Sequence, residues 1–401
     1  MATWPAVRIG SLGRIVTGRT PTSQRPELFG NEFPFITPSD LEYDRPHIST
    51  ERFLSVEGYD NQGRLLLPKQ SVCFTCIGAT IGKLCITKSP SFTNQQINSI
   101  VVDESNHDAA FVFYLLRYYH EHIASTASGA ATPLINKTAF SNFEVEVPPF
   151  VTQRKIAAIL SGYDDLIENN TRRIAILEEM AQAIYREWFV NFRFPGYENV
   201  KPVDSPLGQI PEGWEVVRVG SLLKRLRARK QYKQADVTED GRVPVIDQST
   251  AELLGFHDNL PDFEASLAKP VVVFGDHTCK MELMTTPFSI GPNVVPFVCK
   301  TEHSVGFVFY AVKSLISTQE YKRHWTELNN KDIHLGPCLL TDEFAATISP
   351  MVGEVALLRQ KNRALRTTCD LLLPKLISGK LDVENVDIDV GEPLEEAEVA
   401  A

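Results

Sequence analysis

The feature that most constrains the fold of this chain is that the sequence repeats itself. The segment WPAVRIGSL at 4–12 returns as WEVVRVGSL at 214–222, with six identities at one offset of 210 residues. The tetrapeptide FVFY at 111–114 returns at 307–310. A chain of 401 residues has room for two or three domains. We therefore expect two similar globular domains in tandem.

Each half then closes with a stretch that has the spacing of a coiled-coil seam, in which apolar or small residues recur at alternating steps of three and four. The first stretch follows Pro148-Pro149, and Thr152 is its expected N-cap. The second is expected to begin at Ser349-Pro350 and to end at Gly379. The first seam comprises Ile167, Asn170, Ile174, Leu177, Ala181, Ile184 and Trp188, and the second Leu358, Asn362, Leu365, Cys369, Leu372 and Leu376.

An offset of 188 superimposes the two seams. Both helices are expected to be long, and each carries a narrow seam. Because one helix lies in mid-chain and the other near the end of the chain, we expect the two helices to pair antiparallel. The alternative is that each helix packs on its own domain. The second helix is expected to be the shorter, since Pro149 to Leu177 spans 28 residues and Pro350 to Leu365 only 15.

The predicted fold class is α+β, with two similar mixed α/β domains separated by two long helices in a pseudo-two-fold tandem repeat. Short apolar runs predict strands at 72–77, 83–86, 98–102 and 270–274, and helices are expected at 108–124 and 304–325. The predicted boundaries are 1–148 for the first domain, 149–194 for the first helical spacer, 195–212 for a linker, 213–348 for the second domain, 349–380 for the second spacer and 381–401 for an acidic, disordered tail.

The formal net charge of −10 is concentrated at one end of the chain. Residues 382–401 hold eight acids and no base, so the other 381 residues carry 42 acids and 40 bases, a net of −2. Residues 216–235 hold seven bases and no acid. Such runs suit contact with phosphates, although a plain solvated surface gives the same pattern. The seven scattered cysteines do not form a disulfide framework, and no apolar run spans a membrane, so a cytoplasmic protein is expected.

Motifs that would carry catalysis are incomplete. The run 78–83, GATIGK, is one residue short of a phosphate-binding loop and lacks its Ser or Thr. The run 147–150, VPPF, resembles an amino-methyltransferase motif but lacks its Asp or Asn. Cys73 and Cys76 supply half of a zinc spacing without a second pair. We expect no metal site and a binding or scaffolding protein.

The order of several local sequences resembles the specificity subunit of Type I restriction–modification systems. The resemblance covers residues 4 to 381. In the first half it rests on FITPSDL at 35–41, IGATIGK at 77–83, FTNQQ at 92–96, PP at 148–149 followed by QRKIA at 153–157, and IYREWF at 184–189. In the second half it rests on LGQIPEGW at 207–214, PVIDQ at 244–248, VFGDHT at 273–278 and LLPKLISGKL at 372–381.

The resemblance implies two target-recognition domains, each reading one half of a split, asymmetric site in double-stranded DNA. It also implies that the helices set the gap between the half-sites and dock two methyltransferase (modification) subunits, which methylate adenines with S-adenosylmethionine. Two restriction subunits that use ATP and Mg²⁺ can join them. The chain itself would then catalyse nothing and hold no cofactor. The alternatives are a self-sufficient enzyme with a degenerate motif and a structural adaptor with incidental basic runs.

Bases are read most specifically by Arg or Lys at guanine and by Asn or Gln at adenine, while phosphates position the protein. Asn94-Gln95 could instead close a turn, and Gly275-Asp276-His277 could be a structural turn. In the first domain we expect Arg19, Thr20, Lys83, Asn94, Gln95 and Thr132 to read bases, and Arg25, Arg64 and Lys88 to contact phosphates. In the second we expect Gln248, His257, His277, Lys280, Asn329 and Lys331 to face DNA, and Arg227, Arg229 and Lys230 to contact phosphates.

Overall fold

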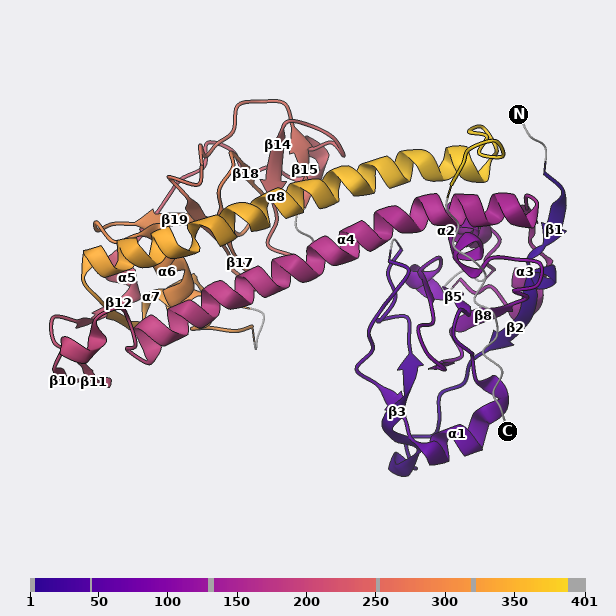
Figure 1. Ribbon diagram of the computed structural model, residues 1–401, viewed down its shortest axis with the longest axis horizontal. Coiled ribbons are helices and arrows are strands. Elements are labelled where there is room, and N and C mark those ends of the chain that lie inside the picture. Colours follow the sequence, from indigo (N-terminus) through magenta and orange to yellow (C-terminus); the bar gives the residue numbers. More distant parts are fainter. Residues whose placement is uncertain (1–3, 44, 129–132, 250–252, 319–321, 389–401) are drawn as a thin grey trace. The chain divides into compact units, whose positions relative to one another are not determined.

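The computed structural model describes residues 4–43, 45–128, 133–249, 253–318 and 322–388 (Figure 1). The chain divides into two compact units, Met1–Asn169 with Asn362–Ala401, and Asn170–Lys361. Each unit contains one mixed domain and one part of each of two long helices, α4 and α8. Within the described ranges, no helix is both long enough and apolar enough to cross a membrane.

The domain of the first unit is built on two small sheets and a two-stranded ladder. The four-stranded antiparallel sheet has the order β2 (Gly13–Thr17), β8 (Ile97–Val102), β5 (Val72–Thr75), β6 (Leu84–Ile86). The second sheet has the order β4 (Phe53–Leu54), β3 (Phe29–Ile36), β7 (Phe92–Thr93), with β3 and β7 parallel. The ladder pairs β1 (Ala6–Arg8) with β9 (Glu144–Glu146), and the helices are α1 (Val56–Gln62), α2 (Ala109–Ser125) and α3 (Lys137–Asn142).

The domain of the second unit has the same topology, which confirms the repeat read from the sequence. Its four-stranded sheet has the order β13 (Leu223–Arg225), β19 (Val294–Cys299), β16 (Val271–Gly275), β17 (Met281–Met284). Its three-stranded sheet has the order β15 (Leu253–His257), β14 (Val243–Ile246), β18 (Ser289–Ile290), again with one parallel pair. The ladder pairs β12 (Glu215–Arg218) with β20 (Asp332–Leu335), and the helices are α5 (Val219–Leu222), α6 (Val305–Val312) and α7 (Trp325–Asn329).

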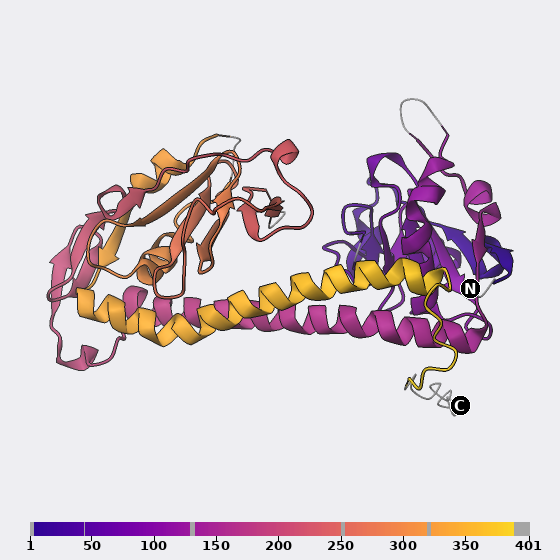
Figure 2. The same ribbon diagram turned by 90° about the horizontal axis from the view of Figure 1, so that it is seen from above.

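The two long helices run antiparallel within each unit (Figures 1 and 2). Helix α4 (Phe150–Tyr185) has 36 residues and α8 (Cys338–Ile377) has 40. In the first unit, Ile156 and Leu160 of α4 share one buried core with Cys369 and Leu376 of α8. In the second unit, the other end of α4 shares a core with the beginning of α8. The helix pair is therefore part of the hydrophobic core of both units.

The seam residues occupy buried or half-buried positions on the two helices. Each seam's asparagine is buried, and the Asn362 amide donates to the backbone oxygen of Ile167 at 3.5 Å. Flanking ion pairs join the helices, such as Arg173 with Glu354 at 2.8 Å. The buried members of the two seams are Asn170, Ala181, Leu358, Asn362, Cys369 and Leu376, and the half-buried members are Ile167, Ile174, Leu177, Ile184, Trp188, Leu365 and Leu372.

The prediction that the second helix begins at Ser349-Pro350 is wrong. Helix α8 begins at Cys338, directly after Pro337, and Pro350 lies inside it. The predicted N-cap Thr152 likewise lies inside α4, where it is buried. The starts at 150 and 338 differ by 188, the offset of the seams, and the prediction that the second helix is the shorter is wrong, since α8 is the longer of the two. A proline within a helix removes one backbone donor, yet α8 continues through the exposed Pro350, with Ile348 and Leu358 buried on either side of it.

Three other boundaries also differ from the prediction. The expected linker 195–212 contains a hairpin of β10 (Pro202–Ser205) and β11 (Gly208–Pro211). The helix expected at 304–325 ends at Val312. The tail expected to be disordered from 381 begins as packed chain, because Val383 is buried in the first core and the Lys155 ammonium donates to the Glu384 backbone oxygen at 2.7 Å. Strands β5, β6, β8 and β16 and helix α2 confirm their predictions within one or two residues.

The first domain is tied to both long helices by polar contacts from α2. The Tyr114 hydroxyl donates to Asp164 Oδ2 of α4 at 2.6 Å, and Arg117 pairs with Asp370 of α8 at 2.7 Å. Burial and the neighbouring Asp164 carboxylate raise the pKa of Tyr114, so its hydroxyl keeps the proton that it donates. These contacts fix how α2 lies against the helix pair within this unit.

The change Tyr114→Phe is expected to destabilise the first unit by about 1.5–3 kcal/mol, because a buried hydrogen bond to a charged group is lost. Tyr310→Phe is the matched control, since Tyr310 is the corresponding residue of the repeated FVFY segment and its hydroxyl has no hydrogen bond among the described residues. Urea denaturation of the full chain measures both changes. Equal destabilisation by the two variants would contradict the assignment.

Candidate nucleic-acid interface

In the first domain, four loops meet at one end of the two sheets. Three backbone hydrogen bonds join them: the amide of Arg19 donates to Thr93 O at 2.9 Å, that of Asn94 to Ile36 O at 3.2 Å, and that of Cys76 to Gln96 O at 2.8 Å. We call this surface the first loop edge, and define it as residues 18–20, 37–40, 76–83 and 94–96. It brings predicted DNA-facing residues from separate parts of the chain onto one framework.

The second domain repeats this framework bond for bond. The amide of Tyr232 donates to Ile290 O at 3.0 Å, that of Gly291 to Ile246 O at 2.9 Å, and that of Asp276 to Asn293 O at 2.8 Å. We call this surface the second loop edge, residues 231–233, 247–249, 276–280 and 291–293. The two edges therefore share a backbone scaffold and differ in the side chains that they present.

Several predicted residues of the first loop edge are available to a ligand. Arg19, Thr20 and Gln95 are exposed, and the Thr20 hydroxyl donates to Gln95 Oε1 at 2.7 Å. This bond orients the Gln95 amide and leaves its nitrogen pointing away from Thr20. Lys83 is half-buried, with its ammonium 6.0 Å from the centre of the Tyr43 ring. Sequence reasoning missed Tyr43, which no local motif connects with Lys83.

The structure does not support Asn94 as a base reader. Its side chain is 9% exposed, its Oδ1 accepts from the Gln96 amide at 3.0 Å, and its Nδ2 donates to Gln96 Oε1 at 3.1 Å. Asn94 therefore closes a turn, the alternative left open by the sequence. Thr132 lies outside the described residues.

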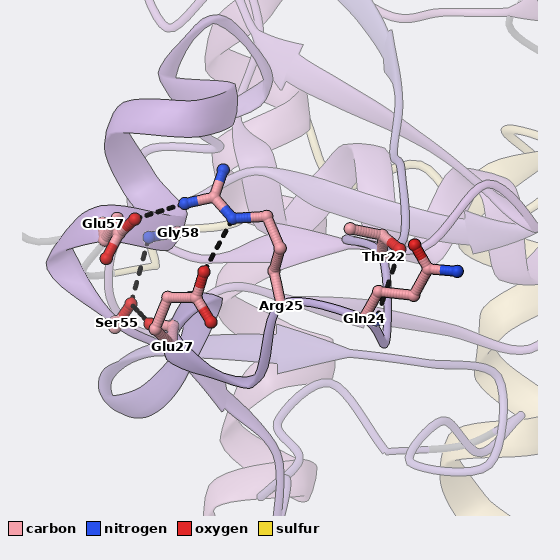
Figure 3. Close-up of polar contacts among 7 residues, drawn as sticks. All are labelled: Thr22, Gln24, Arg25, Glu27, Ser55, Glu57 and Gly58. Atoms are coloured by element: carbon pink, nitrogen blue, oxygen red, sulfur yellow. Dashed lines mark hydrogen bonds and ion pairs between the residues drawn. The ribbon is translucent and has the colours of Figure 1, made fainter.

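Two of the three predicted phosphate contacts of the first domain are already paired with carboxylates. Arg25 pairs with Glu27 at 2.7 Å and also with Glu57 of α1 (Figure 3). The hydrogen bond from Arg25 lowers the pKa of Glu27. Lys88 pairs with Glu168 of α4 at 3.1 Å. Arg64 is exposed and, within the part of the chain that the structure describes, has no carboxylate partner.

The Arg25 pairs have a local structural role. Ser55 caps α1 by accepting from the Gly58 amide at 3.0 Å, and its hydroxyl donates to the Glu27 backbone oxygen at 2.6 Å (Figure 3). Arg25 thus connects the segment 25–27 with the first turn of α1. The ion pairs give Arg25 a positioning role within this unit, and its contact with a phosphate stays a prediction.

In the second domain, Gln248, His277 and Lys280 gather at the second loop edge. Gln248 Oε1 accepts from the His277 amide at 3.2 Å, and its backbone oxygen accepts from the Thr278 hydroxyl at 2.6 Å. His277 and Lys280 are half-buried. The Asn329 side-chain Nδ2 donates to the Trp325 backbone oxygen at 2.6 Å within α7. Lys331 directly precedes β20. Neither residue belongs to the second loop edge.

The prediction that His257 faces DNA is wrong. It is 5% exposed, stacks on Tyr232 with ring centres 4.2 Å apart, and shares a hydrogen bond of 2.9 Å with the Ser289 hydroxyl. Its Nδ1 accepts from the Asn259 amide at 3.1 Å. Burial lowers the pKa of His257, so the folded site disfavours the protonated ring. Its role is structural.

The basic run of the second domain lines a groove of about 570 Å³. Arg229 is held by Asp262 at 3.2 Å, and Lys230 by Asp236 at 2.7 Å. Arg227 is exposed and has no carboxylate partner among the described residues. Sequence reasoning omitted Arg225 and Gln231, although both belong to the basic run. The groove is lined by Arg225, Leu226, Arg227, Ala228, Arg229, Gln231, Ile290, Val294 and Pro296.

Comparison with known proteins connects this architecture with one family. Residues 1–179 match the model of the Type I restriction modification DNA specificity domain. The Type I restriction enzyme MjaIX specificity subunit of Methanocaldococcus jannaschii is 25% identical over 412 residues, which cover 96% of this chain and 94% of that protein. The HindI specificity subunit of Haemophilus influenzae is 33% identical over 165 residues, covering 39% of this chain and 35% of that protein.

The fold also has a counterpart among solved structures. A crystal structure of the Type I restriction–modification system S subunit from M. genitalium matches with a TM-score of 0.56 and 14% identity, covering 94% of this chain and 95% of that one. At this identity the match speaks for the fold. Together, the comparisons confirm the resemblance inferred from the sequence.

Acidification is expected to destabilise the second unit through His257. In the unfolded chain the imidazole takes up a proton below pH ~6.5, whereas the folded site disfavours the proton, so lowering the pH from about 7 towards 5 favours unfolding. The change His257→Gln removes this proton uptake and is expected to flatten the pH dependence of the thermal midpoint. Calorimetry across this pH range measures the effect, and parallel profiles for the two proteins would contradict it.

Proposed function

We propose that this chain, which is similar to Type I restriction–modification specificity subunits, is the non-catalytic, DNA-reading subunit of an adenine methyltransferase complex. Each loop edge reads one half of a split, asymmetric site in double-stranded DNA. The two long helices set the gap between the half-sites and dock the methyltransferase subunits. The chain holds no cofactor in this scheme.

The observation that carries the proposal is one backbone scaffold that bears different side chains in the two domains. The three backbone bonds of the first loop edge recur in the second. At corresponding positions within this framework, the exposed Arg19 is matched by the buried Tyr232, and the exposed Gln95 by the half-buried Pro292. Sequence is read by side chains at base edges. One scaffold with different side chains is therefore suited to reading two different half-sites.

Affinity for the DNA backbone comes from the basic residues that carboxylates leave available. Arg64 and Arg227 are exposed, and the groove beside Arg227 adds Arg225. Arg25, Arg229, Lys88 and Lys230 instead hold loops or helices in place. Contacts with phosphates release counterions, so binding is expected to weaken steeply as the salt concentration rises.

The helices carry exposed apolar side chains that suit a protein partner. In the second unit Ile176 and Met180 of α4 are 48% and 46% exposed, and in the first unit Leu166 of α4 and Leu371 of α8 are 51% and 59% exposed. Removing apolar side chains from water is favourable, and the fully buried core of a protein interface is more apolar than the rest of the protein surface. Methyltransferase subunits that bind S-adenosylmethionine would cover them, and restriction subunits that use ATP and Mg²⁺ could join the same complex.

Selection from random-sequence DNA duplexes tests the proposal. We expect the complex of the full chain with its methyltransferase subunit to select two short motifs separated by a gap of fixed length. The methyltransferase subunit without the chain is the control. A complex that selected no sequence, or a control that selected the same one, would overturn the proposal.

The same selection tests whether the two long helices set the gap between the half-sites. Inserting seven residues into both α4 and α8 keeps the seam in register and lengthens each helix by about 10 Å, the length of about three base pairs. Both half-site motifs should remain, with the gap longer by about three. An unchanged gap would contradict this part of the proposal.

A further inference from the structure

We infer that Lys83 and Lys280 are corresponding residues that bind the sugar–phosphate backbone of DNA. Sequence preference then lies in neighbouring positions where the two domains differ, above all Gln95. This inference rests on the proposed function and divides its candidate residues into two classes. The sequence alone treats Lys83 as a base reader.

The correspondence of the two lysines is shown by backbone geometry. In the first domain the Thr75 amide donates to Lys83 O at 2.9 Å and the Gly82 amide donates to Thr75 O at 3.2 Å. In the second domain the Gly275 amide donates to Lys280 O at 2.8 Å and the Cys279 amide donates to Gly275 O at 2.9 Å. Lys83 and Lys280 therefore end corresponding turns of the two domains.

The turns themselves have diverged around the lysines. Thr75 and Lys83 are eight positions apart, whereas Gly275 and Lys280 are five apart. The residue before each lysine has a positive φ, 96° at Gly82 and 56° at Cys279. A non-glycine residue rarely adopts this conformation. The chain therefore keeps the lysine and its backbone conformation although the loop has changed in length and in sequence.

A lysine that occupies corresponding positions in two domains reading different base sequences is suited to contacting a feature that both half-sites share. The two half-sites differ in their bases but have the same charged backbone, and an ammonium group binds phosphate as a point charge. Both lysines are half-buried, which restricts where the ammonium group can lie. Gln95 has no such counterpart, because Pro292 occupies its position and offers no side-chain hydrogen bond.

The strands provide matched controls. Lys69 and Lys269 lie just before β5 and β16, at the opposite end of these strands from Lys83 and Lys280, and both are exposed. Replacing any of the four lysines by glutamine removes one positive charge. Only the two at the loop edges should affect DNA binding in the way that a phosphate contact does.

The test measures binding of the full complex to a duplex with the selected motif and to one with shuffled half-sites, at several salt concentrations. For Lys83→Gln and Lys280→Gln we expect the slope of log affinity against log salt concentration to become less steep by about 0.9 for each variant. Each variant should lose the same affinity for both duplexes. The selected motif should remain unchanged. Lys83→Arg should keep the slope. Lys69→Gln and Lys269→Gln should change neither slope nor motif, and Gln95→Ala should relax one half-site and keep the slope.

The outcomes separate this inference from the function on which it rests. If the unaltered complex selects no sequence, the proposed function fails. If the unaltered complex selects a split motif but Lys83→Gln or Lys280→Gln changes a base in it, or leaves the salt slope unchanged, the assignment of the lysines to the backbone is overturned while the function stands.

Discussion

The packing of α4 against α8 is the interaction on which the rest of the structure depends. Each unit completes its core with residues from both helices, so Leu160 and Cys369 are buried together in the first unit, and Tyr185 and Phe344 lie in one core in the second. The largest core of each unit therefore combines residues from both halves of the sequence. The chain thus links the folding of its two halves, which have little sequence in common beyond the repeated framework.

This packing was largely predictable, because its signal is periodic. The seam spacing, the offset of 188 and the repeated FVFY segment are visible without a structure. The start of α8 was not, because Ser349-Pro350 has the local features of a helix start, whereas the real start at Cys338 follows a glycine and a proline that give a weaker signal. Proline in mid-helix is disfavoured locally, yet α8 continues through Pro350.

The candidate site was predictable in its residue types but less so in their roles. Arg25 lies in a run without acids, yet Glu57 reaches it from 32 positions away. His257 was expected to face DNA, but its ring lies against Tyr232 and Ser289. Such contacts depend on tertiary structure, which spacing along the chain does not encode. The shared backbone bonds of the two loop edges became visible only when the strands were paired.

The central claim is that this chain alone supplies sequence preference to an adenine methyltransferase. It is tested most directly by a genome-wide map of methylated adenines in cells that produce the methyltransferase subunit with this chain, compared with cells that lack this chain. The account predicts one split, asymmetric motif that is methylated only when the chain is present. Identical adenine methylation in both kinds of cell would contradict it.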